Sequence, residues 1–366
     1  MNPYQSLPAR SFWRTAVAEP EMADIDELWT PKFELGQDDP ILTAGSCFAR
    51  HIGRTLLELG MNWRDAEPAP PGLTAAQRSA RQYGVFSFRT GNIYTAAMLR
   101  QWLGWATGAQ APGTESWVTD GRHFDPFRPS VEPDGYDSAE AMLAAREVTL
   151  AAIRAAVAAA SCLIFTLGLT EAWHDRGTGV VYPVCPGTVR GTFDPERHEF
   201  GNHGFDRVRQ DVLAAVDLAR AVNPRLRVLL TVSPVPLTAT ATGGHALSAN
   251  TYSKSVLRAV AGQLAVEHEH VDYFPAYELI TGVPFRGAFF EANLRDVTAE
   301  GVRFVMRRFT AALERQAADR QAALDRQAGD RPAAEQPSEG ARSGSESEKG
   351  GDFLCDDAVL DYYNAG

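Results

Sequence analysis

Apolar and polar positions along the chain form blocks that predict strands followed by helices. Short runs of consecutive apolar residues predict buried strands, because a strand that is covered on both faces needs no polar positions. Such runs occupy residues 41–44, residues 163–166, and the segments "RVLLTVSPVPL" and "VDYFPAY". Longer segments with apolar residues three and four positions apart predict helices. These segments are "RHIGRTLLEL", "GNIYTAAMLRQWLGWA", "DSAEAMLAAREVTLAAIRAAVAAAS", and residues 206–222, 250–267 and 298–313.

Strands that alternate with helices of this length predict an α/β fold with a mainly parallel sheet and helices on both of its faces. In such sheets, ligands bind beyond the carboxyl ends of the strands. We therefore expect Ser46, Thr170, Glu171 and Ser233 to lie at one edge of the sheet, since each follows a predicted strand.

The composition divides the chain into four parts. Residues 1–40 are rich in Pro, Trp and Phe without a clear period, and we expect an arm packed on the core. Residues 41–315 contain the predicted strands and helices and form the main domain. Residues 316–352 are charged and poor in apolar side chains: the first part allows an extension of the preceding helix, and we expect the second half to be a disordered linker. Residues 353–366 include the apolar segment "FLCDDAVLDYY", which we expect to dock back on the domain.

Composition and charge narrow the class of protein. About 45% of the 366 residues are hydrophobic, which is enough for a large core in one or two domains. The net charge of −11 argues against nucleic acid as a partner, because a nucleic-acid surface needs a basic patch. We expect no secretory signal in "MNPYQSLPARSFW" and no membrane span. The four cysteines lack C-x-x-C spacing, which favours reduced thiols in a cytoplasmic protein. No residue spacing predicts a metal, a cofactor or an oligomeric state.

Several blocks of the sequence resemble one family. The segment "GSCFA" at residues 45–49 is the motif of the GSCFA-domain family, which belongs to the SGNH/GDSL-type hydrolases. The segments "PYQSLPARSFWRTAVA", "GNIYTAAMLRQW", "FTLGLTEAW", "YPVCPGT", "FDPERHEF", "TVSPVPL", "TYSKSVLRAVA" and "YFPAYELITG" resemble further blocks of that family in the same order. The resemblance covers roughly residues 3–310 and implies a three-layer α/β/α sandwich of the SGNH or flavodoxin-like type.

The resemblance also implies a catalytic arrangement. Ser46 matches the nucleophile, which the family presents after the first strand. Gly91 matches the glycine of a second block, with Asn92 beside it as a substrate or oxyanion contact. Thr170 stands where the third block has an oxyanion asparagine. From spacing alone, Ser46 is better explained as the N-cap of the helix that follows it, and the resemblance is what favours the nucleophile or a ligand contact.

One element of the family pattern is absent. The late Asp-x-x-His that supplies the base corresponds here to Asn293 and Asp296, and no histidine follows His270. A serine hydroxyl needs a base to accept its proton. His174 is the first candidate, oriented by Glu171 three residues before it, although a surface histidine explains the same pattern.

Two further residues are candidates for the same edge of the sheet. His245 lies beside two glycines in a segment that could be mobile, and it ranks just below His174 as a base. Lys254 opens a predicted helix, where it could bind an anionic group of a substrate, act as the base, or be an ordinary solvated lysine.

Two functions from different classes follow. The first is an SGNH-type serine esterase or acyltransferase that acts on a small-molecule or glycan acyl ester, with polysaccharide-linked esters as one substrate class. The second is a catalytically silent protein of the same fold that binds a glycan, an acyl carrier or a protein partner. The retained Gly-Ser turn favours the enzyme, and the missing Asp-x-x-His favours the binding protein.

Overall fold

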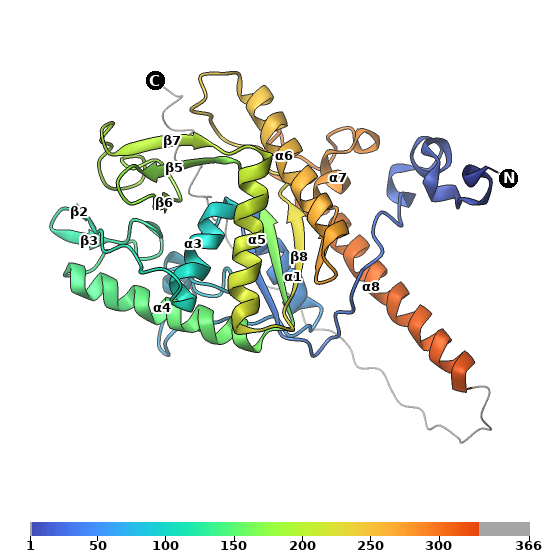
Figure 1. Cartoon of the computed structure of the whole chain (residues 1–366), viewed down its shortest axis with the longest axis horizontal. Helices are drawn as coiled ribbons and strands as arrows, with labels where there is room; N and C mark the ends of the chain where they lie inside the picture. The colour runs from blue at the N-terminus through green and yellow to red at the C-terminus, as the bar shows by residue number, and fades with distance from the viewer. Residues whose placement is uncertain (1, 329–366) are drawn as a thin grey trace.

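The computed structural model describes residues 2–328 and contains a four-stranded parallel sheet at its centre (Figure 1). The strands are β1 (Ile41–Gly45), β4 (Cys162–Leu167), β8 (Arg227–Val232) and β9 (Val271–Phe274), in the order β1-β4-β8-β9. In the register, Ile41 lies opposite Cys162, which in turn lies opposite Arg227. Because all pairs are parallel, the carboxyl ends of the four strands meet at one edge, as the sequence predicts.

Helices cover both faces of this sheet, so the predicted three-layer α/β/α fold is confirmed. Alternate strand residues such as Leu42 and Phe165 pack with helices on one face. These helices are α3 (Ala96–Thr107), α4 (Ala139–Ala159), α5 (Phe205–Val222) and α6 (Ala246–Glu267). The intervening residues, such as Ile41 and Ile164, pack with the other helices. These are α1 (Phe48–Glu58), α7 (Ala276–Thr281) and α8 (Ala299–Ala328).

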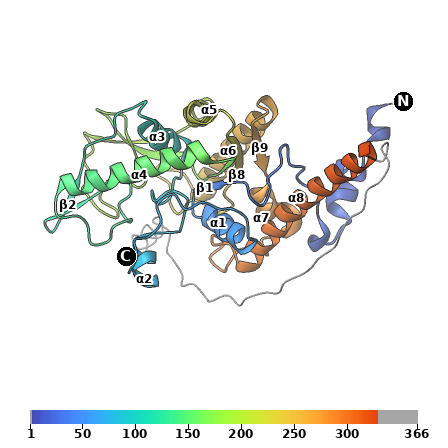
Figure 2. The ribbon, with the colours of Figure 1, turned by 90° about the horizontal axis from the view of Figure 1, so that it is seen from below.

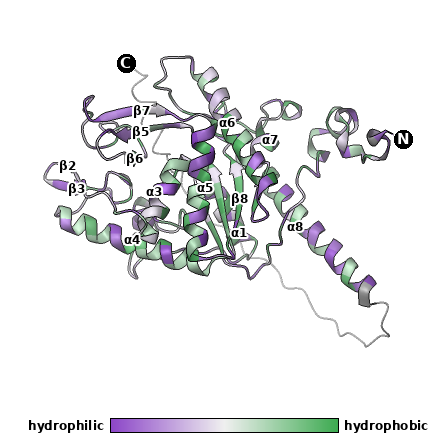
Figure 3. Ribbon diagram, in the orientation of Figure 1, coloured by the Kyte–Doolittle hydropathy of each residue, from purple (hydrophilic) through white to green (hydrophobic). Residues whose placement is uncertain are grey.

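The figures show how this layering follows from hydropathy. Viewed from below, α3 and α5 lie on one side of the strands, and α1 and α8 lie on the other (Figure 2). Apolar residues gather on the central strands and on the helix faces that cover them, whereas polar residues occupy the outer faces (Figure 3). Burying both faces of the strands explains why their sequences read as continuous apolar runs.

The first residues of the chain form short helical turns before β1. These turns are η1 (Pro3–Ser6), η2 (Ala9–Ser11), the π-helical η3 (Arg14–Ala18) and η4 (Met22–Asp24). Ile25, Trp29 and Leu35 are buried in the same apolar cluster as α8. The Trp29 indole N–H donates to the Asp272 carboxylate on β9 at 3.1 Å, which fixes this part of the arm to the sheet.

Helix α8 includes the helical extension that the sequence allows after residue 315. The apolar period ends near residue 313, but the helix runs to Ala328. Residues 316–328 consist largely of Ala, Gln and Arg, which favour helix without a buried face. The predicted disordered linker beyond residue 329 and the docking segment 353–366 lie outside the described residues.

A second, antiparallel sheet lies in the chain between β4 and α5. It consists of β5 (Glu171–Asp175), β6 (Val181–Tyr182) and β7 (His198–Asn202), in the order β6-β5-β7. The sequence predicted a turn around His174, but the structure places this residue in the middle of β5, paired with β7. The reason is long-range pairing, because the partner strand begins more than twenty residues later in the chain.

Smaller elements complete the fold. They are α2 (Ala75–Ala80), η5 (Val283–Phe285) and a hairpin of β2 (Trp117–Thr119) and β3 (Arg122–Phe124) within the long insert 109–135. None of the helices in residues 2–328 combines the length and apolar character that crossing a membrane requires. Within residues 2–328, Cys47, Cys162 and Cys185 form no disulfide bond.

Candidate functional site

The turn that presents Ser46 is held tightly against the neighbouring strand. Gly45 ends β1 with φ +136°, a conformation that side chains rarely adopt. A Cβ atom at this position would lie 2.4 Å from the carbonyl oxygen of Thr166 on β4. The next N–H, that of Ser46, donates to the same carbonyl at 3.1 Å. Glycine is therefore required for β1 to end in contact with β4.

The Ser46 hydroxyl is buried without a hydrogen-bond partner. The residue is 3% exposed, and Oγ makes no hydrogen bond within the described part of the chain. The N-cap of α1 is Cys47, one residue later, and no side chain caps this helix end. The structure therefore does not use Ser46 as the helix cap. The hydroxyl lies instead one residue before the positive end of α1, which favours negative charge nearby.

Gly168 connects Ser46 to a buried lysine. A Cβ atom at Gly168 would lie 3.0 Å from Ser46 Cβ and 3.0 Å from the Tyr94 carbonyl oxygen, so the absence of a side chain permits this contact. The Gly168 carbonyl accepts a hydrogen bond of 2.7 Å from Lys254 Nζ. Lys254 belongs to α6 and is only 1% exposed. Ser46 and Lys254 therefore approach the same glycine, one at its Cα and the other at its carbonyl.

The segment that contains Gly91 and Asn92 lies beside the end of β1. The Ile93 N–H donates to the Gly45 carbonyl at 2.8 Å, and Gly91 has the left-handed φ of +71° that this turn requires. Asn92 is 7% exposed, and its Oδ1 has no hydrogen-bond partner in residues 2–328. A buried amide oxygen without a partner next to the Ser46 turn is a candidate acceptor for a donor group of a ligand.

The groups of Thr170 are used within the protein. Its N–H donates to Ser253 Oγ at 3.0 Å, and its hydroxyl donates to Asn202 Oδ1 at 2.7 Å. Its carbonyl accepts from the His203 N–H at 2.9 Å. Thr170 thus joins the β4–β5 connection to α6 and β7, and these bonds occupy the donors that an oxyanion contact would use.

Glu171 and His174 lie on opposite faces of β5, because side chains three positions apart on a strand point in opposite directions. The Glu171 carboxylate accepts from the Thr240 hydroxyl at 2.6 Å and from the Ala241 N–H at 3.3 Å. His174 Nε2 lies 3.0 Å from His203 Nε2. The structure therefore does not bring Glu171 and His174 together.

Both imidazoles of this pair favour the neutral state. Burial, together with the neighbouring His174, lowers the pKa of His203 to about 4. Burial also lowers the pKa of His174, as does the Arg207 guanidinium. One neutral ring can donate its Nε2 proton to the other, so the pair links β5 to β7.

His245 caps α6. Its Nδ1 accepts from the Leu247 N–H at 3.1 Å, and the residue is exposed. This bond to its own helix explains why a histidine stands between two glycines and α6. The explanation needs no contact between His245 and Ser46. The sequence analysis predicted a segment that could be mobile around His245. It did not consider that a histidine side chain can cap a helix.

The segment at the position of the missing base forms a closed turn. Asn293 Oδ1 accepts from the N–H groups of Arg295 and Asp296, each at 3.0 Å. Asn293 Nδ2 donates to Asp296 Oδ2 at 2.8 Å. The Asp296 side chain is 57% exposed and lies 3.6 Å from Arg295 Nη1. The aspartate that replaces the histidine is therefore a surface carboxylate held by its own turn.

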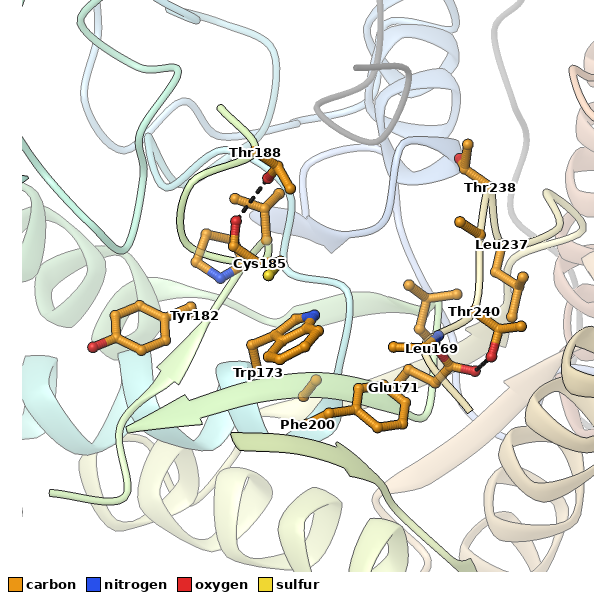
Figure 4. Close-up of a pocket in the computed structure, with 15 residues that line it drawn as sticks. Leu169, Glu171, Trp173, Tyr182, Cys185, Thr188, Phe200, Leu237, Thr238 and Thr240 are labelled. Atoms are coloured by element: carbon orange, nitrogen blue, oxygen red, sulfur yellow. Dashed lines mark hydrogen bonds between the residues drawn. The ribbon is translucent and has the colours of Figure 1, made fainter. Parts of the chain in front are cut away.

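A cavity of about 290 Å³ lies beside Glu171 (Figure 4). It lies between the small sheet and the segment 237–241 that follows β8. Leu169, which follows Gly168, forms part of its wall. The other lining residues are Glu171, Ala172, Trp173, Tyr182, Pro183, Val184, Cys185, Thr188, Phe200, Leu237, Thr238, Ala239, Thr240 and Ala241. Sequence analysis missed this cavity, since its walls come from four separate segments.

No cluster of three or more His, Cys, Asp or Glu side chains in residues 2–328 could hold a metal ion. The polar groups that the residues described above contribute at this edge of the sheet include the Ser46 hydroxyl, Lys254 Nζ and the Asn92 amide.

Comparisons with known proteins relate this arrangement to a family. The model of the GSCFA family matches residues 40–309. Two solved structures are similar, each at 11% identity with a TM-score of 0.36, over 77% of this chain and 99% of the other. One is an acetyl esterase mutant with an acetate ion, and the other is a carbohydrate esterase of family 3 from Talaromyces cellulolyticus. A comparison with curated proteins gave no match.

Proposed function

Because this chain belongs to the GSCFA family, we propose that it is an SGNH-type serine esterase or acyltransferase with Ser46 as its nucleophile. The observation that carries this proposal is the Ser46 hydroxyl, which is buried and makes no hydrogen bond although α1 begins two residues later. A buried hydroxyl without a partner costs free energy, so a structural role does not account for it.

Lys254 is the base that we assign to Ser46. Its Nζ donates to the Gly168 carbonyl, and Ser46 Cβ approaches the same residue. His174 is paired with His203 on the other face of β5, and His245 caps a helix, so neither has the contact that Lys254 has. Serine paired with lysine is a known variant of the serine–histidine arrangement.

The proposed reaction has two halves. In the first, Ser46 Oγ attacks the carbonyl carbon of the ester while the neutral Lys254 amine takes the hydroxyl proton. The tetrahedral intermediate then breaks its bond to the alcohol oxygen, which leaves with the proton from Nζ. In the second, water or another alcohol loses its proton to Nζ and attacks the acyl-Ser46 carbonyl, which releases the acyl group and returns the proton to Oγ.

We assign the stabilisation of the oxyanion to the Asn92 amide and the positive end of α1. Asn92 is buried in the segment that is hydrogen-bonded to Gly45. The Ser46 N–H donates to the Thr166 carbonyl, and the N–H of Thr170 donates to Ser253, so both are already used. Preorganised donors contribute about 10²–10³-fold to such reactions.

The second candidate function is a silent binding protein of the same fold, with a glycan, an acyl carrier or a protein as its ligand. Three observations favour it. The Ser46 N–H is used by Thr166, Ser46 is almost completely buried, and an exposed aspartate, Asp296, replaces the late histidine.

Fluorophosphonate labelling combined with hydrolysis of 4-nitrophenyl acetate separates the two functions. We expect the wild type to be labelled at Ser46, and Ser46→Ala to lose labelling and turnover. Lys254→Met should lose about 10²–10⁴-fold in kcat/KM, since it removes the base.

Lys32→Met is the matched control. Lys32 Nζ also donates to backbone carbonyls, those of His268 and Val271, but at the amino end of β9. The Lys32→Met variant should keep full activity. Wild-type protein that is neither labelled nor active on any acyl ester would support the binding protein instead.

A further inference from the structure

The walls of the cavity beside Gly168 are mainly apolar and aromatic. Trp173 and Phe200 come from neighbouring strands of the small sheet, and Leu169 and Leu237 from the ends of β4 and β8 (Figure 4). The Trp173 indole and the Phe200 ring lie 5.5 Å apart at an angle of 56°. Such walls favour ligands with apolar groups over ligands that need many hydrogen bonds.

The polar groups in these walls are largely occupied. The Glu171 carboxylate accepts from Thr240 and Ala241, which ties the segment 237–241 to β5. The Thr188 hydroxyl donates to the Cys185 carbonyl at 2.7 Å. Thr238 Oγ1 is buried and makes no hydrogen bond within residues 2–328. A sugar ring would leave most of its hydroxyl groups unpaired in this cavity, which costs binding energy.

The size and position of the cavity define an apolar ligand. An apolar cavity of about 150 Å³ holds benzene, so the volume of about 290 Å³ suits an apolar group of roughly six to ten carbons. Leu169 is bonded directly to Gly168, the residue that Ser46 Cβ approaches. A carbonyl at Ser46 could therefore extend its acyl chain past Leu169 into the cavity.

We propose that this cavity binds a medium-chain acyl group, of about six to ten carbons by the volume comparison above, in the substrate of this protein. The proposal rests on the proposed function in one respect, namely that the acyl group belongs to the ester that Ser46 attacks. Burial of each additional methylene in such a pocket contributes about 0.8 kcal/mol, or roughly a fourfold gain in binding.

The activity test compares 4-nitrophenyl acetate with 4-nitrophenyl octanoate. We expect the wild type to prefer octanoate in kcat/KM. Ala239→Trp adds a large ring at an exposed position of the cavity wall and should lower the octanoate-to-acetate ratio by at least about tenfold. Leu247→Trp is the control, because Leu247 is 70% exposed and lies outside the cavity wall, and it should keep the wild-type ratio.

The binding test does not depend on turnover. Methyl octanoate is titrated by calorimetry into Ser46→Ala and into Ser46→Ala/Ala239→Trp. Binding that the second substitution weakens supports the acyl site even if no ester is hydrolysed, in which case only the proposed function fails. A Ser46-labelled, active enzyme with equal kcat/KM for acetate and octanoate overturns the acyl site and leaves the proposed function intact. Binding of methyl glucoside but not of methyl octanoate also overturns it.

Discussion

Substitution of Gly45 by alanine tests the contact on which the whole site depends. The added methyl group would meet two backbone atoms of Thr166, the carbonyl oxygen at 2.4 Å and the nitrogen at 2.7 Å. Both atoms belong to the central strand β4, which has neighbours on each side and cannot shift without breaking its pairing. The φ of +136° adds strain, since alanine rarely adopts it.

The expected loss of stability follows from the clash with Thr166 and from the backbone strain at residue 45. Backbone strain at one residue costs about 1–3 kcal/mol. Forcing an extra methyl group into a packed region costs about 1–3 kcal/mol as well. We therefore expect Gly45→Ala to lower the free energy of unfolding by about 4 kcal/mol, taking the middle of the summed range. For a domain of this size the melting temperature should fall by roughly 10 °C.

Urea unfolding followed by circular dichroism measures this loss. Gly72→Ala is the matched control, because Gly72 has a positive φ of +95° but nothing within 4 Å of an added Cβ. The Gly72→Ala variant has backbone strain but no steric clash, and it should lower the free energy of unfolding by only about 1 kcal/mol. If the two variants lose the same free energy, β1 does not approach β4 as described, and the contact between Ser46 and Gly168 loses its support.

Three further predictions concern buried charge, pH and the end of the chain. Asp125→Asn should lower the free energy of unfolding by about 3–5 kcal/mol, since the buried guanidiniums of Arg128 and Arg146 would lose their only shared carboxylate contact. His203 stays neutral when folded, with a pKa of about 4 against 6.5 unfolded, so its contribution is complete above pH 6.5 and is lost as the pH falls towards 4. His203→Gln should therefore reduce the loss of stability between pH 7 and 4.5. Deletion of residues 329–352 should leave the melting temperature nearly unchanged, because the segment is poor in apolar residues.

Each of these has a control or a contrary outcome. Asp134→Asn removes a carboxylate that is 73% exposed beside Arg81, and it should cost less than about 1 kcal/mol. If Asp134→Asn and Asp125→Asn lose the same free energy of unfolding, the buried ion pairs of Asp125 do not stabilise the protein as described. An unchanged pH slope in His203→Gln would show that the imidazole titrates normally in the folded protein. A large fall in melting temperature on deletion would show that residues 329–352 dock on the domain.

The sequence located the serine turn because its determinants are local. A buried apolar run, a glycine and a helical period adjoin one another at residues 41–59, so the end of β1 and the start of α1 could be predicted from neighbours alone. The same holds for the parallel order of the main sheet, since helices between strands force parallel pairing.

The environment of Ser46 came only from the tertiary structure. Lys254 looked like an ordinary lysine at a helix start, but it is buried against a carbonyl 86 residues earlier in the chain. Glu171 and His174 looked like partners, but strand pairing with β7 turns them to opposite faces. A periodic pattern reports which face of an element is apolar, and it carries no information about which distant polar group lies across from a given side chain.

The sequence by itself thus determined the layers of the fold and the position of Ser46 at the end of the first strand, both of which depend on residue type and short spacing. Only the tertiary structure decided that Thr170 is tied to Asn202, that Lys254 and Ser46 approach the same Gly168, and that four segments enclose a cavity whose wall includes Leu169. These features arise where elements far apart in the chain pack together. Their contacts depend on the packing angles and pairing of whole helices and strands, which no local pattern specifies.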